Sequence, residues 1–271
     1  MKPSMQKARV PKPSVKRMFV DLSLPIEESD SEVIPVKIKY FSHREGAEQM
    51  GQIFGLNADD LPGKLGWAGE EVTLITHAGT HMDAPWHYGP ISEGKPARMI
   101  DEVPLDWCYG PGVVLDFREK PEGKELTVDD VKSAFEKIGH SVRAGDIILL
   151  NTGASRWWGA KSYPERGVGL GRDATLWLVE QGVRVIGTDC WGLDRPFSYM
   201  RHEYQKTLNI NCIWPSHYAG QRREYCQLEK LANLDLLPPG GFTVTCFPIK
   251  IGRASAGWTR VVAMFEMEGD G

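Results

Sequence analysis

The sequence lacks several features that mark particular classes of protein. Its five cysteines are odd in number and widely spaced, and none forms a CxxC pair. This pattern argues against a disulfide framework and a finger-type zinc site, and it is typical of reduced thiols in a cytoplasmic protein. No stretch approaches the ~18 apolar residues of a membrane-spanning helix. We therefore expect a cytoplasmic, globular protein without a membrane partner.

The sequence also has no excess of positive charge. The chain has 32 Lys and Arg residues against 36 Asp and Glu residues, so its formal net charge is −4. A general nucleic-acid-binding protein usually carries a basic excess, so no nucleic-acid partner is expected. Basic residues do gather in residues 1–18, but without the apolar stretch of a secretory signal. That segment is expected to be a basic N-terminal arm.

Patterns of strands and helices alternate irregularly along residues 19–271. The apolar run DIILLN at 146–151 predicts a buried strand, and 127–138 predicts a helix with Thr127 as its N-cap. Residues 43–67 show no clear period and are expected to form a loop or a short helix. Further strands are expected at 19–25, 33–41, 71–76, 113–117, 183–188, 242–251 and 259–267, and a helix at 173–181. Without strict βαβ repetition or a break in composition, the pattern predicts one α/β domain with flanking helices.

Histidines gather in one short segment, THAGTHMDAPWHY at 76–88. An eleven-residue window would contain roughly 0.3 histidine if they were spread evenly, and a His-rich tract is a candidate metal site. Here His77, His81 and His87 fall in one such window with Asp83, all at odd positions. Alternate side chains of an extended chain share a face, whereas a helix would turn Asp83 away from His81. The spacing therefore predicts that these side chains converge on one side of a strand.

Two histidines and an aspartate form a ligand set suited to Zn²⁺, Mn²⁺ or Fe²⁺. Three protein ligands leave positions open for water and substrate, which is the pattern of a catalytic metal site. The alternative is an exposed His-rich turn, or histidines satisfied by hydrogen bonds. For the isolated His43, His140 and His202, a surface or hydrogen-bonded role is expected.

The segment HAGTHMDAPWH resembles the HxGTHxDxPxH signature of the metal-dependent cyclase-type hydrolases, a family that includes bacterial kynurenine formamidase and isatin hydrolase. Other family-like segments follow in order and extend the resemblance over about residues 19–268. They are VDLS at 20–23, GDIILLNTG at 145–153, IGTD at 186–189 and LEKLANL at 228–234. The resemblance implies a single domain of the swivelling β/β/α type with a mixed sheet. It also implies a divalent metal, Zn²⁺ or Mn²⁺, with one or two ions per chain.

The resemblance further implies roles for individual residues. It makes His87 the general acid/base beside the metal and Asp83 a bridge between two metals. His217 and Glu229 stand twelve residues apart, as does the second-metal pair of the binuclear members, whereas Glu224 is a competing candidate out of register. A single-metal site, with His217 in a loop and Glu229 an ordinary charge, is the alternative. The implied metal ligands are His77, His81, Asp83, His217 and Glu229.

These features predict a hydrolase that uses metal-activated water to cleave an amide C–N bond in a small cyclic or aromatic carbonyl substrate. A lactone or ester hydrolase, a cyclase or dehydratase, and a metal-binding protein with a vestigial site are the alternatives. Tryptophans are plentiful in the loops around the expected site; Trp86, Trp157 and Trp158 are candidates to stack on the substrate, or else core or interface anchors. The resemblance implies a homodimer or homotetramer. The extra length at 1–18 and 41–68 is expected either to cover the pocket or to exchange between subunits.

Overall fold

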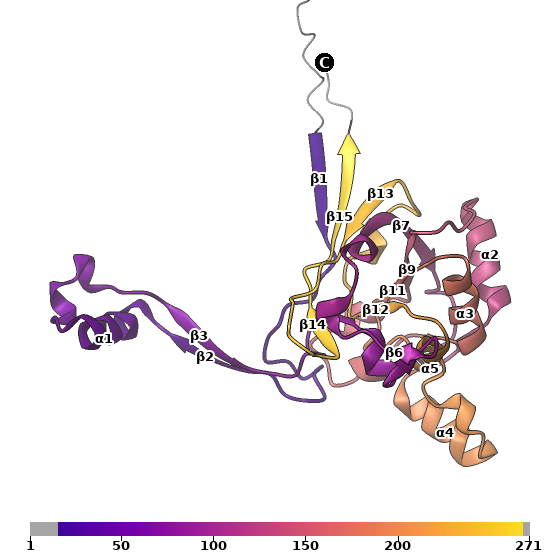
Figure 1. Cartoon of the computed structure of the whole chain (residues 1–271), viewed down its shortest axis with the longest axis horizontal. Coiled ribbons are helices and arrows are strands. Elements are labelled where there is room, and N and C mark those ends of the chain that lie inside the picture. Colours follow the sequence, from indigo (N-terminus) through magenta and orange to yellow (C-terminus); the bar gives the residue numbers. More distant parts are fainter. Residues whose placement is uncertain (1–15, 268–271) are drawn as a thin grey trace, which may run out of the picture.

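The structure is a computed structural model that describes residues 16–267. Most of the expected basic arm at 1–18 lies outside the described residues, and Lys16 already begins the first strand. No helix in the described part of the chain is long and apolar enough to cross a membrane. Figure 1 shows a body built around one twisted sheet, from which a long hairpin projects.

The sheet has nine strands in the order β1-β15-β13-β7-β9-β11-β12-β4-β14. The strands are β1 Lys16–Asp21, β15 Val262–Met267, β13 Phe242–Thr245, β7 Tyr109–Asp116, β9 Ile147–Asn151, β11 Val185–Thr188, β12 Cys226–Glu229, β4 His81–Asp83 and β14 Ala256–Trp258. The four strands from β7 to β12 run parallel to one another, and the other pairings are antiparallel. The prediction of a mixed α/β sheet is therefore confirmed.

Two hydrophobic cores cover the two faces of the central strands. Ile148 and Leu150 of β9 point into one core, together with apolar residues of α2 (Val128–Ile138) and α3 (Arg172–Glu180). Ile147 and Leu149 point into the other core. Because β9 is buried on both faces, it reads as a continuous apolar run rather than an alternating one.

The expected elements near the core are mostly confirmed. Helix α2 starts after Thr127, whose side chain and that of Asp130 form the predicted capping box. The strand expected at 242–251 ends at Thr245, because the chain then turns before β14, which the sequence analysis missed. Two short helices, α4 (Phe197–Thr207) and α5 (Pro215–Arg222), were also missed. Minor pairs of strands are β5 Ile91–Ser92 with β6 Lys95–Pro96, and β8 Glu125–Leu126 with β10 Gly169–Leu170.

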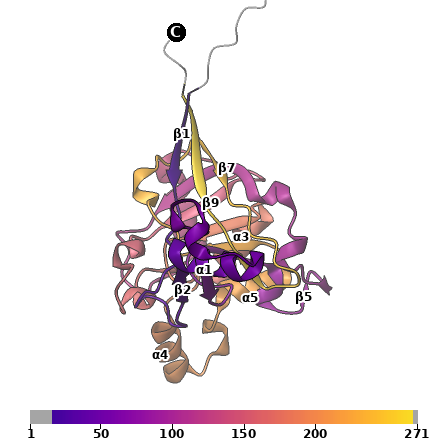
Figure 2. The same cartoon turned by 90° about the vertical axis from the view of Figure 1, so that its left-hand side faces the viewer.

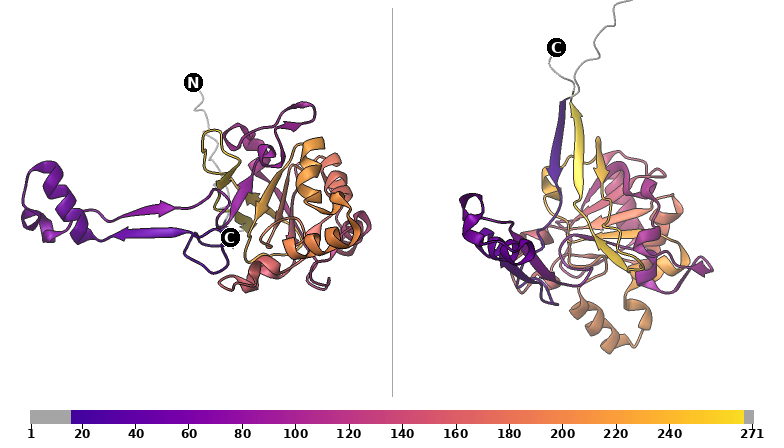
Figure 3. Two further views of the ribbon diagram at one scale, coloured as in Figure 1. Left: turned by 90° about the horizontal axis from the view of Figure 1, so that it is seen from below. Right: turned by 60° about the vertical axis from the view of Figure 1, so that its left-hand side comes forward.

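Residues 37–73 form an arm that stands away from the body (Figure 3). Strands β2 (Lys37–Phe41) and β3 (Gly69–Thr73) make its two-stranded stem, and α1 (His43–Phe54) lies at its tip. Figure 2 looks at this tip with the body behind it. The region expected to be a loop or short helix is therefore a capped helix on a hairpin. The half-buried strand expected at 33–41 starts only after Pro35 and is largely exposed, because its strand partner is β3 of the same hairpin and the stem stands away from the sheet.

Candidate metal centre

The histidine segment is not one extended strand. Only His81 and Asp83 lie on β4, where they share a face as predicted. His77 lies in a turn that Gly79 permits with its φ of +58°, and His87 lies on a 3-10 turn that begins at Pro85. The prediction of a single strand is therefore wrong at both ends. The two bends nevertheless return His77 and His87 toward Asp83.

Asp83 is the centre of the arrangement. Its side chain is fully buried, and its Oδ1 lies 2.8 Å from His77 Nδ1 and 3.2 Å from His81 Nε2. Its Oδ2 lies 3.8 Å from His217 Nε2 and 3.9 Å from His87 Nε2. One carboxylate thus faces four imidazole rings.

Glu229 supplies a second buried carboxylate from the end of β12, which pairs with β4 so that Glu229 stands opposite His81. Its Oε2 lies 3.5 Å from His81 Nε2, and its Oε1 lies 3.8 Å from His217 Nε2. Helix α5 carries His217, so this residue is not in a loop. The structure therefore brings together all five residues implied as ligands, and His87 with them.

These residues form two overlapping groups that could each hold a cation. One group is His77, Asp83 and His87, and the other is His81, Asp83 and Glu229; the ligand atoms of each group lie within 4.8 Å of one another. Asp83 belongs to both, as the expected bridge does. His87 lies close enough to be a ligand, so its implied role as acid/base remains a prediction.

The donor set fits a divalent cation. Within the described chain, His81 Nε2 and both side-chain oxygens of Asp83 are buried without a hydrogen-bond partner. Buried polar atoms without partners are costly and rare in native proteins. A divalent ion that prefers nitrogen and oxygen ligands would satisfy all three atoms.

Burial and neighbouring charges shift the pKa values of this cluster, and at Asp83 and His217 the two effects oppose each other. Burial alone would raise the pKa of Asp83, but the surrounding histidines hold it well below its ordinary value. Burial and the nearby Asp83 charge raise the pKa of Glu229. Burial lowers the pKa of His87 to about 4. His217 would also be lowered by burial, but the Asp194 carboxylate raises its pKa to about 10.

Asp194 is a residue of the site that the sequence analysis missed. It accepts hydrogen bonds from the Ser216 backbone N–H, at 2.7 Å, and from His217 Nδ1. The contact at Nδ1 directs the other ring nitrogen of His217 toward Asp83 and Glu229. No motif marks Asp194 in the sequence, because it meets His217 only through the packing of α5.

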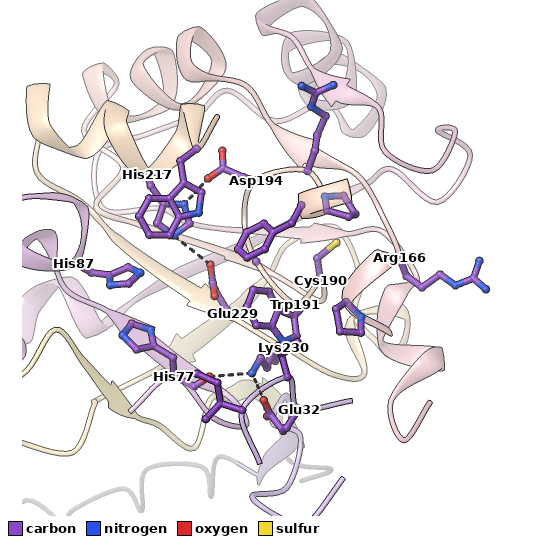
Figure 4. A pocket seen from close by; sticks show the side chains of 18 of the residues that line it. Glu32, His77, His87, Arg166, Cys190, Trp191, Asp194, His217, Glu229 and Lys230 are labelled. Carbon is purple, nitrogen blue, oxygen red and sulfur yellow. Dashed lines mark hydrogen bonds and ion pairs between the residues drawn. The ribbon is translucent and has the colours of Figure 1, made fainter. Parts of the chain in front are cut away.

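A cavity of about 320 Å³ opens onto the cluster (Figure 4). His77, His87, His217 and Glu229 contribute polar atoms to its wall. The apolar part of the wall comes from Val33, Ile34, Ile75, Trp191, Phe197 and Trp214. Trp214 stacks on His217, with ring centroids 4.3 Å apart. Cys190 also lines the cavity, but burial raises its pKa to about 12, which disfavours the reactive thiolate.

The three tryptophans predicted to contact substrate are not among the described residues that line this cavity. Trp86 is partly exposed, since its neighbour His87 takes the inward position of the 3-10 turn. Trp157 stacks against the guanidinium of Arg166, and Trp158 donates a hydrogen bond to Glu27. Trp191 and Trp214 take the place in the wall that we expected these tryptophans to occupy.

The remaining histidines and the competing glutamate lie outside the cluster. His140 contacts Asp146, with 2.8 Å between Nε2 and Oδ2, whereas His43 and His202 are exposed. Their surface or hydrogen-bonded roles are thereby confirmed. Glu224 pairs with Arg98 instead of joining the cluster.

Comparison with known proteins relates this geometry to a family. The kynurenine formamidase of Geobacillus thermodenitrificans is 28% identical over 184 residues, which cover 68% of this chain and 74% of the relative. An isatin hydrolase bound to the product analogue thioisatinate has a TM-score of 0.72 at 21% identity, with 93% of each chain covered. A predicted metal-dependent hydrolase from Bacillus stearothermophilus has a TM-score of 0.58 at 18% identity, with 92% of this chain and 98% of the other covered.

The model of the family described as "Putative cyclase" matches residues 20–195, which is more than half of the chain. The expected fold is confirmed by the isatin hydrolase structure, and the relatives are enzymes of the hydrolase class. The chain therefore belongs to the putative cyclase family and is a hydrolase.

Proposed function

We propose that this protein is a metal-dependent hydrolase that cleaves an amide C–N bond in a small cyclic or aromatic carbonyl compound. The observation that carries the proposal is the buried Asp83, which faces four imidazoles at the wall of a mainly apolar cavity. The kynurenine formamidase and isatin hydrolase relatives support the choice of an amide over other bonds.

The metal would be held by the residues whose donor atoms meet around Asp83. Both Zn²⁺ and Mn²⁺ accept such a set of imidazole and carboxylate ligands, and the shared position of Asp83 suits one or two ions. When bound, a divalent ion lowers the pKa of a coordinated water from about 15.7 to about 7. The proposed ligands are His77, His81, Asp83, His217 and Glu229.

His87 is proposed to move the proton. Its imidazole lines the cavity, and its Nε2 lies 3.9 Å from Asp83 Oδ2. A neutral ring at this place can accept a proton from the attacking water and return it to the departing nitrogen. Trp191 and Trp214 would hold the flat apolar part of the substrate against the wall.

The test is hydrolysis by the purified, metal-loaded protein of an N-formyl aniline, a cyclic aromatic amide and an aromatic lactone. We expect turnover of at least one amide, and a loss of roughly 100-fold or more in the Asp83→Asn variant, since even residues behind the ligands are worth about 10–100-fold. Turnover of the lactone alone would show that the enzyme cleaves an ester bond and not the proposed amide bond. No turnover of any of the three would overturn the proposed chemistry.

We further propose a cytoplasmic enzyme whose partners are its small substrate and a second copy of the chain. The five cysteines are all free and buried, which suits a reducing compartment. The arm exposes Tyr40, Ile53 and Phe54 by 68%, 65% and 62%. Other apolar residues of the arm, Leu56, Leu65, Trp67 and Val72, are exposed as well. Exposed apolar patches of this kind mark interaction sites, which supports a homodimer, or a tetramer made of two such dimers, built on the arm.

A further inference from the structure

Two charged side chains that the proposed function does not use are buried beside the metal centre. Lys230 follows Glu229 at the end of β12, and its side chain is 1% exposed. Glu32 comes from the segment that precedes the arm, and its side chain is 4% exposed. Lys230 Nζ lies 2.7 Å from Glu32 Oε2, and Figure 4 shows the pair next to His77.

This ion pair holds the turn that carries His77 at two points. Lys230 Nζ donates a hydrogen bond to the backbone oxygen of His77, at 2.9 Å. Glu32 Oε1 accepts a hydrogen bond from the backbone N–H of Gly79, at 2.7 Å. The hydroxyl of Thr80 also donates to the backbone oxygen of Lys230. The backbone on both sides of Ala78 is therefore attached to the end of the strand that supplies Glu229.

His77 needs such support more than His81 does. The strand pairing of β4 with β12 and β14 fixes His81, which stands opposite Glu229 and Trp258. His77 lies outside the ladder, in a turn whose Gly79 adopts a left-handed conformation. Its ring must nevertheless stay 2.8 Å from Asp83 Oδ1. A site that binds a metal requires its ligands to be held within about 0.5 Å of the productive geometry.

The burial of this ion pair is weak evidence of a contribution to global stability. Taking two charges out of water is costly, and apolar residues of similar volume in place of a buried ion pair are often neutral or stabilising. The hydrogen bonds of the pair to the His77 turn instead indicate a local role, which is to hold this turn in place. The ammonium also lies 5.2 Å from the centroid of the Trp191 ring, so the same pair supports one wall of the cavity.

We propose that Glu32 and Lys230 form a latch whose function is to position His77 in the metal centre. The two are positioning residues, because their hydrogen bonds hold the His77–Gly79 backbone, and both also line the cavity. The latch also ties the segment before the arm to the strand end that carries Glu229. Its effect on metal binding rests on the proposed function, whereas its effect on the His77 ring can be measured without metal.

The test is the double variant Glu32→Gln/Lys230→Met, which removes both charges and leaves no unpaired buried ion. The introduced glutamine keeps an oxygen for the Gly79 N–H, and the introduced methionine keeps much of the length of the lysine stem. The matched control is Arg98→Met/Glu224→Gln, which removes an ion pair outside the cluster. Circular dichroism and thermal unfolding of both variants establish that they fold.

Two readouts are compared with the wild type. In metal-free protein, the imidazole ¹⁵N–¹H NMR signals of His77 are expected to broaden or split in the latch variant only. In a Zn²⁺ titration with a chromophoric chelator, the latch variant is expected to bind at least one ion about 10–100-fold more weakly, as for other residues that orient a ligand. The control is expected to stay within about twofold of the wild type, because the Arg98–Glu224 pair lies outside the cluster.

Unchanged His77 signals in a folded latch variant would overturn the proposal, and so would an equal effect of the control. A wild type that binds no Zn²⁺ would overturn the proposed metal chemistry instead. In that case the His77 spectrum alone still decides for or against the latch.

Discussion

The metal centre and the arm differ in whether their contacts join distant or neighbouring parts of the sequence. The centre joins residues from 77 to 229, is buried, and depends on strand pairing and helix packing far apart in the sequence. The arm is a continuous segment, 37–73, whose stem and helix make their contacts locally and leave apolar side chains in water. An isolated two-stranded hairpin is at best marginally stable. The centre is therefore assembled from distant parts of the chain, whereas the arm leaves apolar side chains exposed, which supports the proposed homodimer.

The largest effect within this comparison is expected at His87. Replacing it by alanine removes the proposed proton carrier, and general acid–base groups contribute about 10²–10⁴-fold to rate. Turnover should fall by this factor while the metal content stays that of the wild type, as measured by kinetics and elemental analysis on the same preparation. Loss of metal along with activity would show that His87 is a ligand.

A smaller effect is expected at Asp194, which touches the cluster through His217. In Asp194→Asn the acceptor for His217 Nδ1 is weakened, and metal affinity should fall about 10–100-fold. A chelator-competition titration measures this change. The matched variant Asp146→Asn alters the contact with His140, a histidine outside the cluster, and should leave the affinity unchanged.

The smallest effect on the centre is expected from the arm. The double change Ile53→Glu/Phe54→Glu places negative charge on the exposed tip of the arm and should abolish a homodimer. The free energy of unfolding of the single chain should change by less than about 0.5 kcal/mol, as at other surface sites. Light scattering after size-exclusion chromatography should give twice 30.3 kDa, or a higher even multiple, for the wild type and 30.3 kDa for the variant.

Leu105→Glu is the control for this experiment, since Leu105 is an exposed apolar residue outside the arm. It should keep the wild-type mass. A wild type that is monomeric at tens of micromolar would remove the arm from the interface, and so would an arm variant that keeps the wild-type mass.

The elements that the sequence predicts best are those with local signals. The run at 146–151 and the capped helix at 128–138 are examples, and the alternation of His81 and Asp83 on β4 is another. The arm helix also had a local signal, since Ser42 and Glu45 form a capping box, but the polar composition of the segment obscured it.

Other features depend on contacts between distant parts of the chain. His77 and His87 reach Asp83 through turns, so no single period describes them. Asp194 and Lys230 acquire their roles only when α5 and β12 pack beside the histidine segment. The family resemblance pointed to His217 and Glu229 where periodicity alone did not. It offered no guide to the tryptophans, because Trp191 and Trp214 reach the cavity from loops.

The most direct test of the central claim is the metal content per chain of protein purified without chelator, for the wild type and Glu229→Ala in parallel. Glu229 belongs to only one of the two groups that share Asp83. A two-metal centre predicts close to two equivalents in the wild type and close to one in the variant. Close to one equivalent in both would show a single-metal site that does not use Glu229. No metal in either protein would contradict the account.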